Sequence, residues 1–124
     1  MGFVVGSVGE LSGEMPYTAF YAKKSFINNN KDTINRFNEA INKGLDYVIK
    51  NNEEKIAEAI INQFPDSSMN DVIKIVKRYK DADSWLNNTT ITEESYKNLE
   101  NIIIDNDLLD NYVDFNKLVI NLNE

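Results

Sequence analysis

The sequence of 124 residues contains no cysteine and no histidine. Without cysteine the chain can form no disulfide, no thiolate zinc site and no cysteine nucleophile. Without histidine it has no imidazole metal ligand and no Ser-His-Asp or Cys-His catalytic arrangement. The groups that remain for chemistry are carboxylates, lysine, tyrosine, hydroxyls and backbone groups. We therefore expect a protein that is not an enzyme, with no cofactor and no metal site.

Basic residues are also in the minority. The chain has 13 Lys and Arg against 20 Asp and Glu, for a net charge of −7. This balance argues against a nucleic-acid partner, because phosphate backbones require clustered positive charge. No stretch approaches the roughly 18 consecutive apolar residues of a membrane span. The hydrophobic fraction of 42% is nevertheless enough to pack a core.

The beginning of the chain has a β-prone sequence. Residues 3–8 (FVVGSV) and 17–22 (YTAFYA) are rich in β-branched or aromatic side chains and predict two short strands. The glycines and the proline of residues 9–16 predict a loop between the strands. We therefore expect residues 1–23 to form a strand-loop-strand crossover.

From residue 24 onward the apolar residues follow the period of amphipathic helices. Side chains that accept hydrogen bonds from first-turn amides mark several helix starts. The pattern predicts a short turn at 23–27, a helix over 32–50 capped by Asn30 or Asp32, a helix from 53 to Pro65, a helix begun by Ser68, a long helix begun by Thr90 and a final turn capped by Asp114.

Two residues in the helical part suggest tertiary packing. Gly44 lies inside the helix expected at 32–50, where it favours a close helix contact. Trp85, the one tryptophan, is expected to fill the core beneath a connecting loop, with ligand stacking as an alternative. The predicted fold is a single domain, 1–124, mainly α with a short N-terminal β element. Five or so helices of residues 24–124 pack on one or two strands.

The short motifs that could indicate a phosphate-binding, calcium-binding or catalytic site do not support such a site. The cluster Gly6, Gly9 and Gly13 lacks the Lys-Ser/Thr of a phosphate-binding loop. The acidic stretch 105–110 has aspartate where a calcium loop needs glycine. The pairs Glu53-Glu54 and Glu93-Glu94 stand at predicted helix starts, where the helix dipole accounts for them.

One longer passage is more specific. Residues 9–24 (GELSGEMPYTAFYAKK) resemble the SGExPYTxFxAxK passage of solute-binding proteins of ABC importers, of the nitrate, sulfonate, taurine and thiamine-precursor type. Further similar segments follow in the same order at 40–48, 64–66, 76–85, 90–96 and 113–119. The resemblance covers nearly the whole chain.

The resemblance implies the C-terminal portion of a periplasmic-binding-protein-like α/β lobe, because family members are two to three times longer. They bind a solute between two lobes and deliver it to a permease without catalysis. The implied ligand is a small anionic or heteroaromatic solute such as nitrate, an alkanesulfonate or a thiamine pyrimidine precursor. By analogy the cleft residues are Ser12, Gly13, Glu14, Tyr17 and Thr18.

The resemblance also implies an extracytoplasmic location for the full-length family. This sequence shows neither a signal-peptide pattern nor an anchoring cysteine, so its own location stays open. A truncated product, a separately encoded part and a fragment are all compatible with its length.

Other interpretations of the same residues remain open. Gly13 and Pro16 can simply shape the crossover, with Tyr17 packed against it. Two strands do not form a stable sheet alone, so we expect self-association through the N-terminal strands. The alternative is that residues 1–16 refold against the helices or stay mobile, which leaves a mainly helical monomer. The competing function is a helical protein–protein interaction module, or a remnant without ligand activity.

Overall fold

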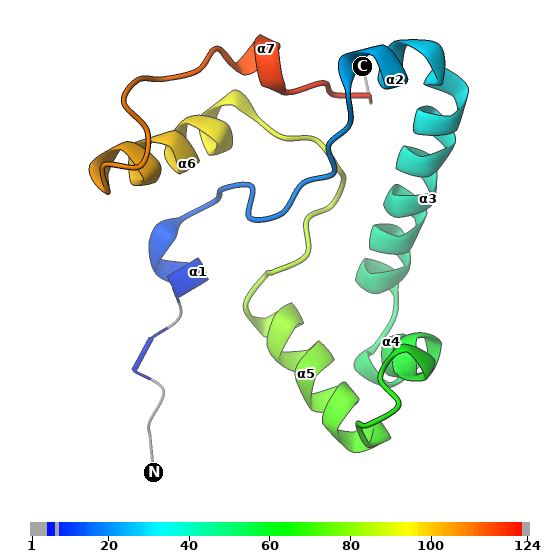
Figure 1. Ribbon diagram of the computed structural model, residues 1–124. Helices are drawn as coiled ribbons and strands as arrows, with labels where there is room; N and C mark the ends of the chain where they lie inside the picture. Colours follow the sequence, from blue (N-terminus) through cyan, green and yellow to red (C-terminus); the bar gives the residue numbers. More distant parts are fainter. Residues whose placement is uncertain (1–4, 7, 123–124) are drawn as a thin grey trace. The chain divides into compact units, whose positions relative to one another are not determined.

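The computed structural model describes residues 5, 6 and 8–122, and these residues are mainly helical (Figure 1). The elements are α1 (Val8–Ser12), α2 (Lys24–Asn29), α3 (Lys31–Lys50), α4 (Glu53–Ile60), the 3-10 helix η1 (Ile61–Gln63), α5 (Met69–Asp81), α6 (Glu93–Asp105) and α7 (Phe115–Leu118). Within this described part, no helix has the length and apolar content needed to cross a lipid bilayer. The predicted mainly α fold is confirmed.

The contacts divide the chain into two compact units. Unit 1 comprises residues 1–35 and 90–124, and unit 2 comprises residues 36–89, so that the boundary falls within α3. Neither boundary coincides with residue 23 or 24, where the composition changes. The expectation that the whole chain folds as a single domain stays a prediction.

Unit 2 contains the hydrophobic core. Ile56 and Ala57 of α4 pack against Val72 and Val76 of α5, and all four side chains are buried. Sequence signals at the helix starts explain this pairing. The Asn52 side chain accepts from Lys55 N at 3.1 Å, and Ser68 Oγ accepts from Asp71 N at 3.2 Å. Ser68 thus caps α5 as predicted.

Trp85 closes this core from the connection that follows α5. Its ring packs against the buried cluster and stacks on Tyr79, with the ring centroids 5.6 Å apart. The predicted role of Trp85 in the core is confirmed. Lys80 also joins distant segments of unit 2, because its Nζ donates to the Asn51 carbonyl at 2.8 Å.

Unit 1 is organised around α6, and its N-cap differs from the predicted one. Thr92, not Thr90, caps the helix, and its side chain accepts from Ser95 N at 3.0 Å. The Asn121 side chain explains the difference. It accepts from Ile91 N at 3.1 Å and donates to Ile91 O at 3.0 Å. This pairing holds residue 91 outside the helix.

The chain after α6 is fixed to the helix by side chains. The carboxylate of Glu100, 5% exposed, accepts from Val113 N at 2.7 Å. Asp114 then caps α7 as predicted. The rings of Tyr96 and Phe115 meet edge to face with centroids 5.5 Å apart. Burial and the nearby carboxylate of Glu100 raise the pKa of Tyr96 from its usual value.

The predicted N-terminal strands are not found in the described residues. Residues 17–22 are irregular, and residues 9–16, expected to be a loop, include most of α1. The prediction of a strand at 3–8 lies largely outside the described residues, but Val8 already belongs to α1. A strand requires a hydrogen-bonded neighbour, and the described part of the chain supplies none for residues 17–22. The strand-loop-strand prediction for 1–23 is therefore wrong for the residues described.

The close helix contact expected at Gly44 is also absent. A Cβ atom built at Gly44 would meet nothing within 4 Å, although the glycine lies inside α3 as predicted. Packing therefore does not require a glycine at this position.

We expect Gly44→Ala to raise the free energy of unfolding by about 0.5–1 kcal/mol, because alanine loses less backbone entropy in a helix. Urea unfolding followed by far-UV circular dichroism measures the change. A loss of stability in Gly44→Ala would show that an unseen contact fills the open space.

Candidate functional site

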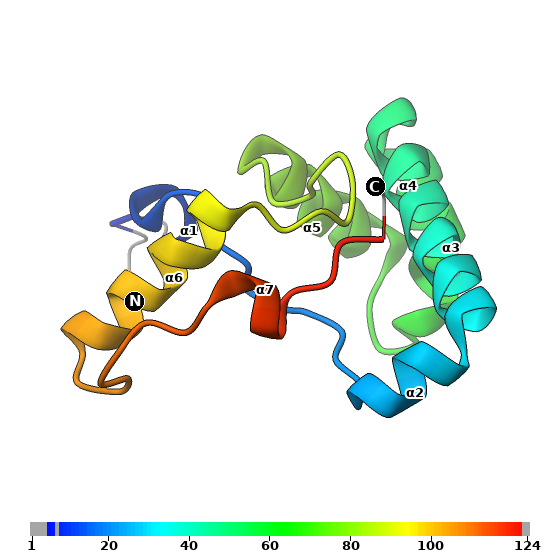
Figure 2. The same cartoon turned by 90° about the horizontal axis from the view of Figure 1, so that it is seen from above.

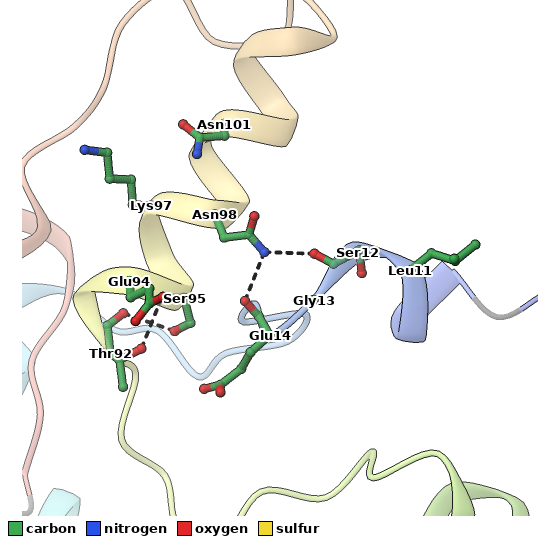
Figure 3. A pocket seen from close by; sticks show the side chains of 10 residues that line it. All are labelled: Leu11, Ser12, Gly13, Glu14, Thr92, Glu94, Ser95, Lys97, Asn98 and Asn101. Carbon is green, nitrogen blue, oxygen red and sulfur yellow. Dashed lines mark hydrogen bonds between the residues drawn. The ribbon is translucent and has the colours of Figure 1, made fainter.

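The candidate site is a hollow within unit 1, lined by the loop after α1 and by residues of α6 up to Asn101 (Figure 3). In the ribbon of Figure 2, α1 lies beside α6. The volume of the hollow is about 600 Å³. Its lining combines carboxylates, hydroxyls, carboxamides and one lysine. The lining residues are Leu11, Ser12, Gly13, Glu14, Thr92, Glu94, Ser95, Lys97, Asn98 and Asn101.

Asn98 joins the two sides of the hollow. Its Nδ2 donates to Ser12 O at 2.9 Å and to Glu14 O at 3.1 Å (Figure 3). A carboxamide nitrogen carries two hydrogens. Both are donated here, to the carbonyls of the residues immediately before and after Gly13. These bonds connect segments more than 80 residues apart in the sequence.

Gly13 between the two carbonyls has a backbone conformation that favours glycine. Its φ is +72°, and a Cβ there would lie 3.5 Å from Asn98 Nδ2. An L-residue in this region is strained by about 1 kcal/mol. The glycine lets the chain turn so that both neighbouring carbonyls face α6.

The structure brings together three of the five residues predicted for the cleft. Ser12, Gly13 and Glu14 line the hollow, whereas Tyr17 and Thr18 do not. The Tyr17 side chain is 92% exposed. The role of all five in ligand binding stays a prediction.

The α6 side of the hollow was not predicted from the sequence. Glu94, Asn98 and Asn101 lie at helical spacing on one side of α6, away from the apolar positions 99, 102 and 103. A polar stripe of this kind is typical of any helix surface in contact with water. Only the hydrogen bonds from Asn98 to residues 12 and 14 distinguish this stripe from an ordinary solvated helix surface.

The hollow offers little to a metal ion. Among the residues that the structure describes, no group of three or more acidic side chains is arranged to hold one. The two lining carboxylates, Glu14 and Glu94, come from opposite sides of the hollow. Weak polar recognition of a small molecule is the chemistry that such a lining supports.

One curated protein provides a comparison across almost the whole chain. "Putative binding protein YtlA" of Bacillus subtilis (strain 168) is 33% identical over 119 residues. The match covers 96% of this chain and 36% of that protein, so the chain spans about a third of the length of its relative. No protein-family profile and no solved structure matches the chain. The chain is therefore similar to part of a binding protein.

Proposed function

We propose that this chain is the C-terminal part of a solute-binding protein that serves an ABC importer, and that it binds and does not catalyse. The similarity to a curated binding protein over 119 residues carries the proposal. The resemblance of residues 9–24 to the importer-associated family adds the transport role. The hollow beside Ser12, Gly13 and Glu14 lies in the same passage.

A thermal-shift screen tests the binding function. Nitrate, taurine and 4-aminopyrimidine are the probes, because they represent the solute classes that the resemblance implies. A ligand that binds only the folded chain stabilises it by about 2.7 kcal/mol at one hundred times its Kd. A rise in melting temperature with at least one probe is the expected result, and no rise with any probe would contradict the binding function of this chain.

Variants of lining residues then locate the binding. Ser12→Ala and Glu14→Gln should reduce the shift, since both side chains line the hollow. Gly13 is a poor choice, because its positive φ makes any substitution strained with or without a ligand. Glu58→Gln serves as the control, because Glu58 is exposed on α4 in the other unit.

A second function, a protein–protein interaction module, is favoured by the exposed surface. The most exposed large apolar side chains cluster near the beginning of the chain, at Val5, Leu11, Tyr17 and Tyr21. Large apolar side chains exposed in one stretch of the sequence are candidates for contact with a partner.

We propose that these exposed apolar side chains mediate self-association. Sedimentation velocity should show a species larger than a monomer that dissociates on dilution. The double variant Tyr17→Lys and Tyr21→Lys should be monomeric, because burying a charged side chain in a contact between two chains is unfavourable. Leu108→Lys, at a site that is 78% exposed elsewhere in unit 1, should keep the association. A monomeric wild-type chain at high concentration would contradict this proposal.

A further inference from the structure

Helix α3 has an apolar ridge along one side. Phe37, Ile41, Leu45 and Ile49 follow one another at a spacing of four residues, which places them in a single row on the helix surface. No residue of α3 is fully buried, and the two ends of the row, Phe37 and Ile49, are 44% and 45% exposed. The described chain therefore covers this ridge only in part.

The core of unit 2 makes little use of α3. Helix α5 is shorter than α3 and equally amphipathic, yet it buries Val72 and Val76 against α4. The core formed by α4 and α5 lies toward the C-terminal end of α3 (Figure 1), where Val48 packs against it. The ridge residues are not among the side chains that pack on this core. An apolar helix face of this length needs a further partner to be buried.

The two flanks of the ridge differ. On one flank, Asn42 Oδ1 accepts from Thr89 N at 3.0 Å and Asn38 Oδ1 accepts from the Thr89 hydroxyl at 2.6 Å, so the connection after α5 lies there. On the other flank is Gly44, three residues after Ile41, where a Cβ atom would meet nothing within 4 Å. A glycine inside a helix costs about 1 kcal/mol relative to alanine and usually has a packing reason. The described chain supplies no such reason, so this flank suits a partner that approaches the helix backbone closely.

The ridge also contains no charged residue. Glu39, Lys43 and Asp46 lie on the opposite side of the helix by their spacing. Permanent protein contacts are apolar and poor in charge at their centre, like a domain core cut in half. The ridge is therefore suited to permanent burial against another apolar surface.

The length of the relative indicates what covers the ridge. The match extends over 36% of the Bacillus subtilis protein, so nearly two thirds of that protein lies outside it. Within one folded chain, the apolar face of a helix is buried against other elements of the same chain. The self-association proposed above uses other residues, Tyr17 and Tyr21, in the other unit. The remaining part of the binding protein is therefore the occupant that accounts for the ridge.

We propose that the α3 ridge is the surface to which the rest of the solute-binding protein docks, with an apolar element of that part lying against Gly44. The inference rests on the proposed function and adds the surface through which this chain joins the remainder of the protein.

A chimera tests the inference. In it, this chain replaces the matching segment of the Bacillus subtilis relative, and amide hydrogen exchange over residues 37–49 is compared with that of the free chain by mass spectrometry. We expect these amides to exchange at least about tenfold more slowly in the chimera, because packing of the ridge suppresses local opening of the helix. Equal exchange rates over 37–49 in the two proteins would overturn the inference.

The variant Gly44→Leu distinguishes docking from general stabilisation. In the free chain it should not lower stability, since the space beside Gly44 is open and leucine is the better helix former. In the chimera it should abolish most of the slower exchange, because the leucine side chain holds the docked element away from the helix. Lys43→Leu is the matched control, because it introduces the same side chain on the opposite side of α3 and should leave the exchange of the chimera unchanged.

The remaining outcomes identify the occupant. Equal effects of Gly44→Leu and Lys43→Leu in the chimera would overturn the assignment of the ridge. Exchange over residues 37–49 that slows in the free chain as its concentration rises would show that a second copy covers the ridge, and would also overturn the inference. The thermal-shift screen of the free chain is independent of these measurements. A failure of docking therefore leaves the binding function intact, and docking without any thermal shift would contradict the binding function alone.

Discussion

Replacing Ile56 with alanine is expected to lower the free energy of unfolding of unit 2 by about 3 kcal/mol. Ile56 is 1% exposed in the core formed by α4 and α5. The substitution removes buried methyl and methylene groups and leaves a cavity that the small core cannot close. Because small domains are stable by only about 5–15 kcal/mol, this single change removes a large share of the stability.

Trp85 provides the measurement for this prediction. It is the one tryptophan of the chain and packs against the same core, so its fluorescence reports the unfolding of unit 2 in urea. Ile75→Ala is the matched control, since Ile75 lies on the same core helix, α5, but is 49% exposed. It should cost less than about 1 kcal/mol. Equal losses in the two variants would show that α4 and α5 pack through a different face.

The helices could be predicted from sequence because their signals are local. The apolar spacing of α3 and the Ser68 cap of α5 each lie within a few residues of the element they define. Thr90 was the wrong cap for α6 because the deciding contact comes from Asn121, 30 residues away from Ile91. A local pattern includes no information about such a partner.

The strand at residues 17–22 was predicted wrongly for a related reason. Residues 17–22 have the aromatic and β-branched composition of a strand, but composition does not create the neighbour with which a strand must pair. Tyr17 and Tyr21 are almost fully exposed in the structure. The sequence thus indicated a preference for extended structure. The described residues include no strand with which residues 17–22 could pair.

Three of the ten residues that line the candidate site, Ser12, Gly13 and Glu14, could be predicted from sequence. Residues 12–14 could be singled out because they lie in the passage that resembles solute-binding proteins of ABC importers and include a glycine and a hydroxyl side chain. The α6 residues could not, because Asn98 and Asn101 have the composition of an ordinary solvated helix face. Their role depends on the approach of a loop more than 80 residues earlier in the chain.

Asn98 is the residue on which the geometry of this loop most depends, and Asn98→Ala is expected to release it. The variant loses the two bonds from Nδ2 to Ser12 O and Glu14 O. Each such bond contributes about 0.5–1.5 kcal/mol, so unit 1 should lose about 1–3 kcal/mol. Asn98→Asp should be at least as damaging, because a carboxylate cannot donate and would face two carbonyl oxygens.

The amide resonances of residues 12–14, with Gly13 as the most distinctive, report the release of the loop directly. They should move toward random-coil positions in both variants, while the fluorescence of Trp85 in unit 2 stays unchanged. Asn101→Ala is the control on the same helix, because Asn101 lines the hollow but its Oδ1 accepts from the Tyr112 hydroxyl at 2.7 Å. Native resonances for residues 12–14 in Asn98→Ala would show that Gly13 and its neighbours hold the turn without α6. In that case the hollow would be shaped by the loop alone.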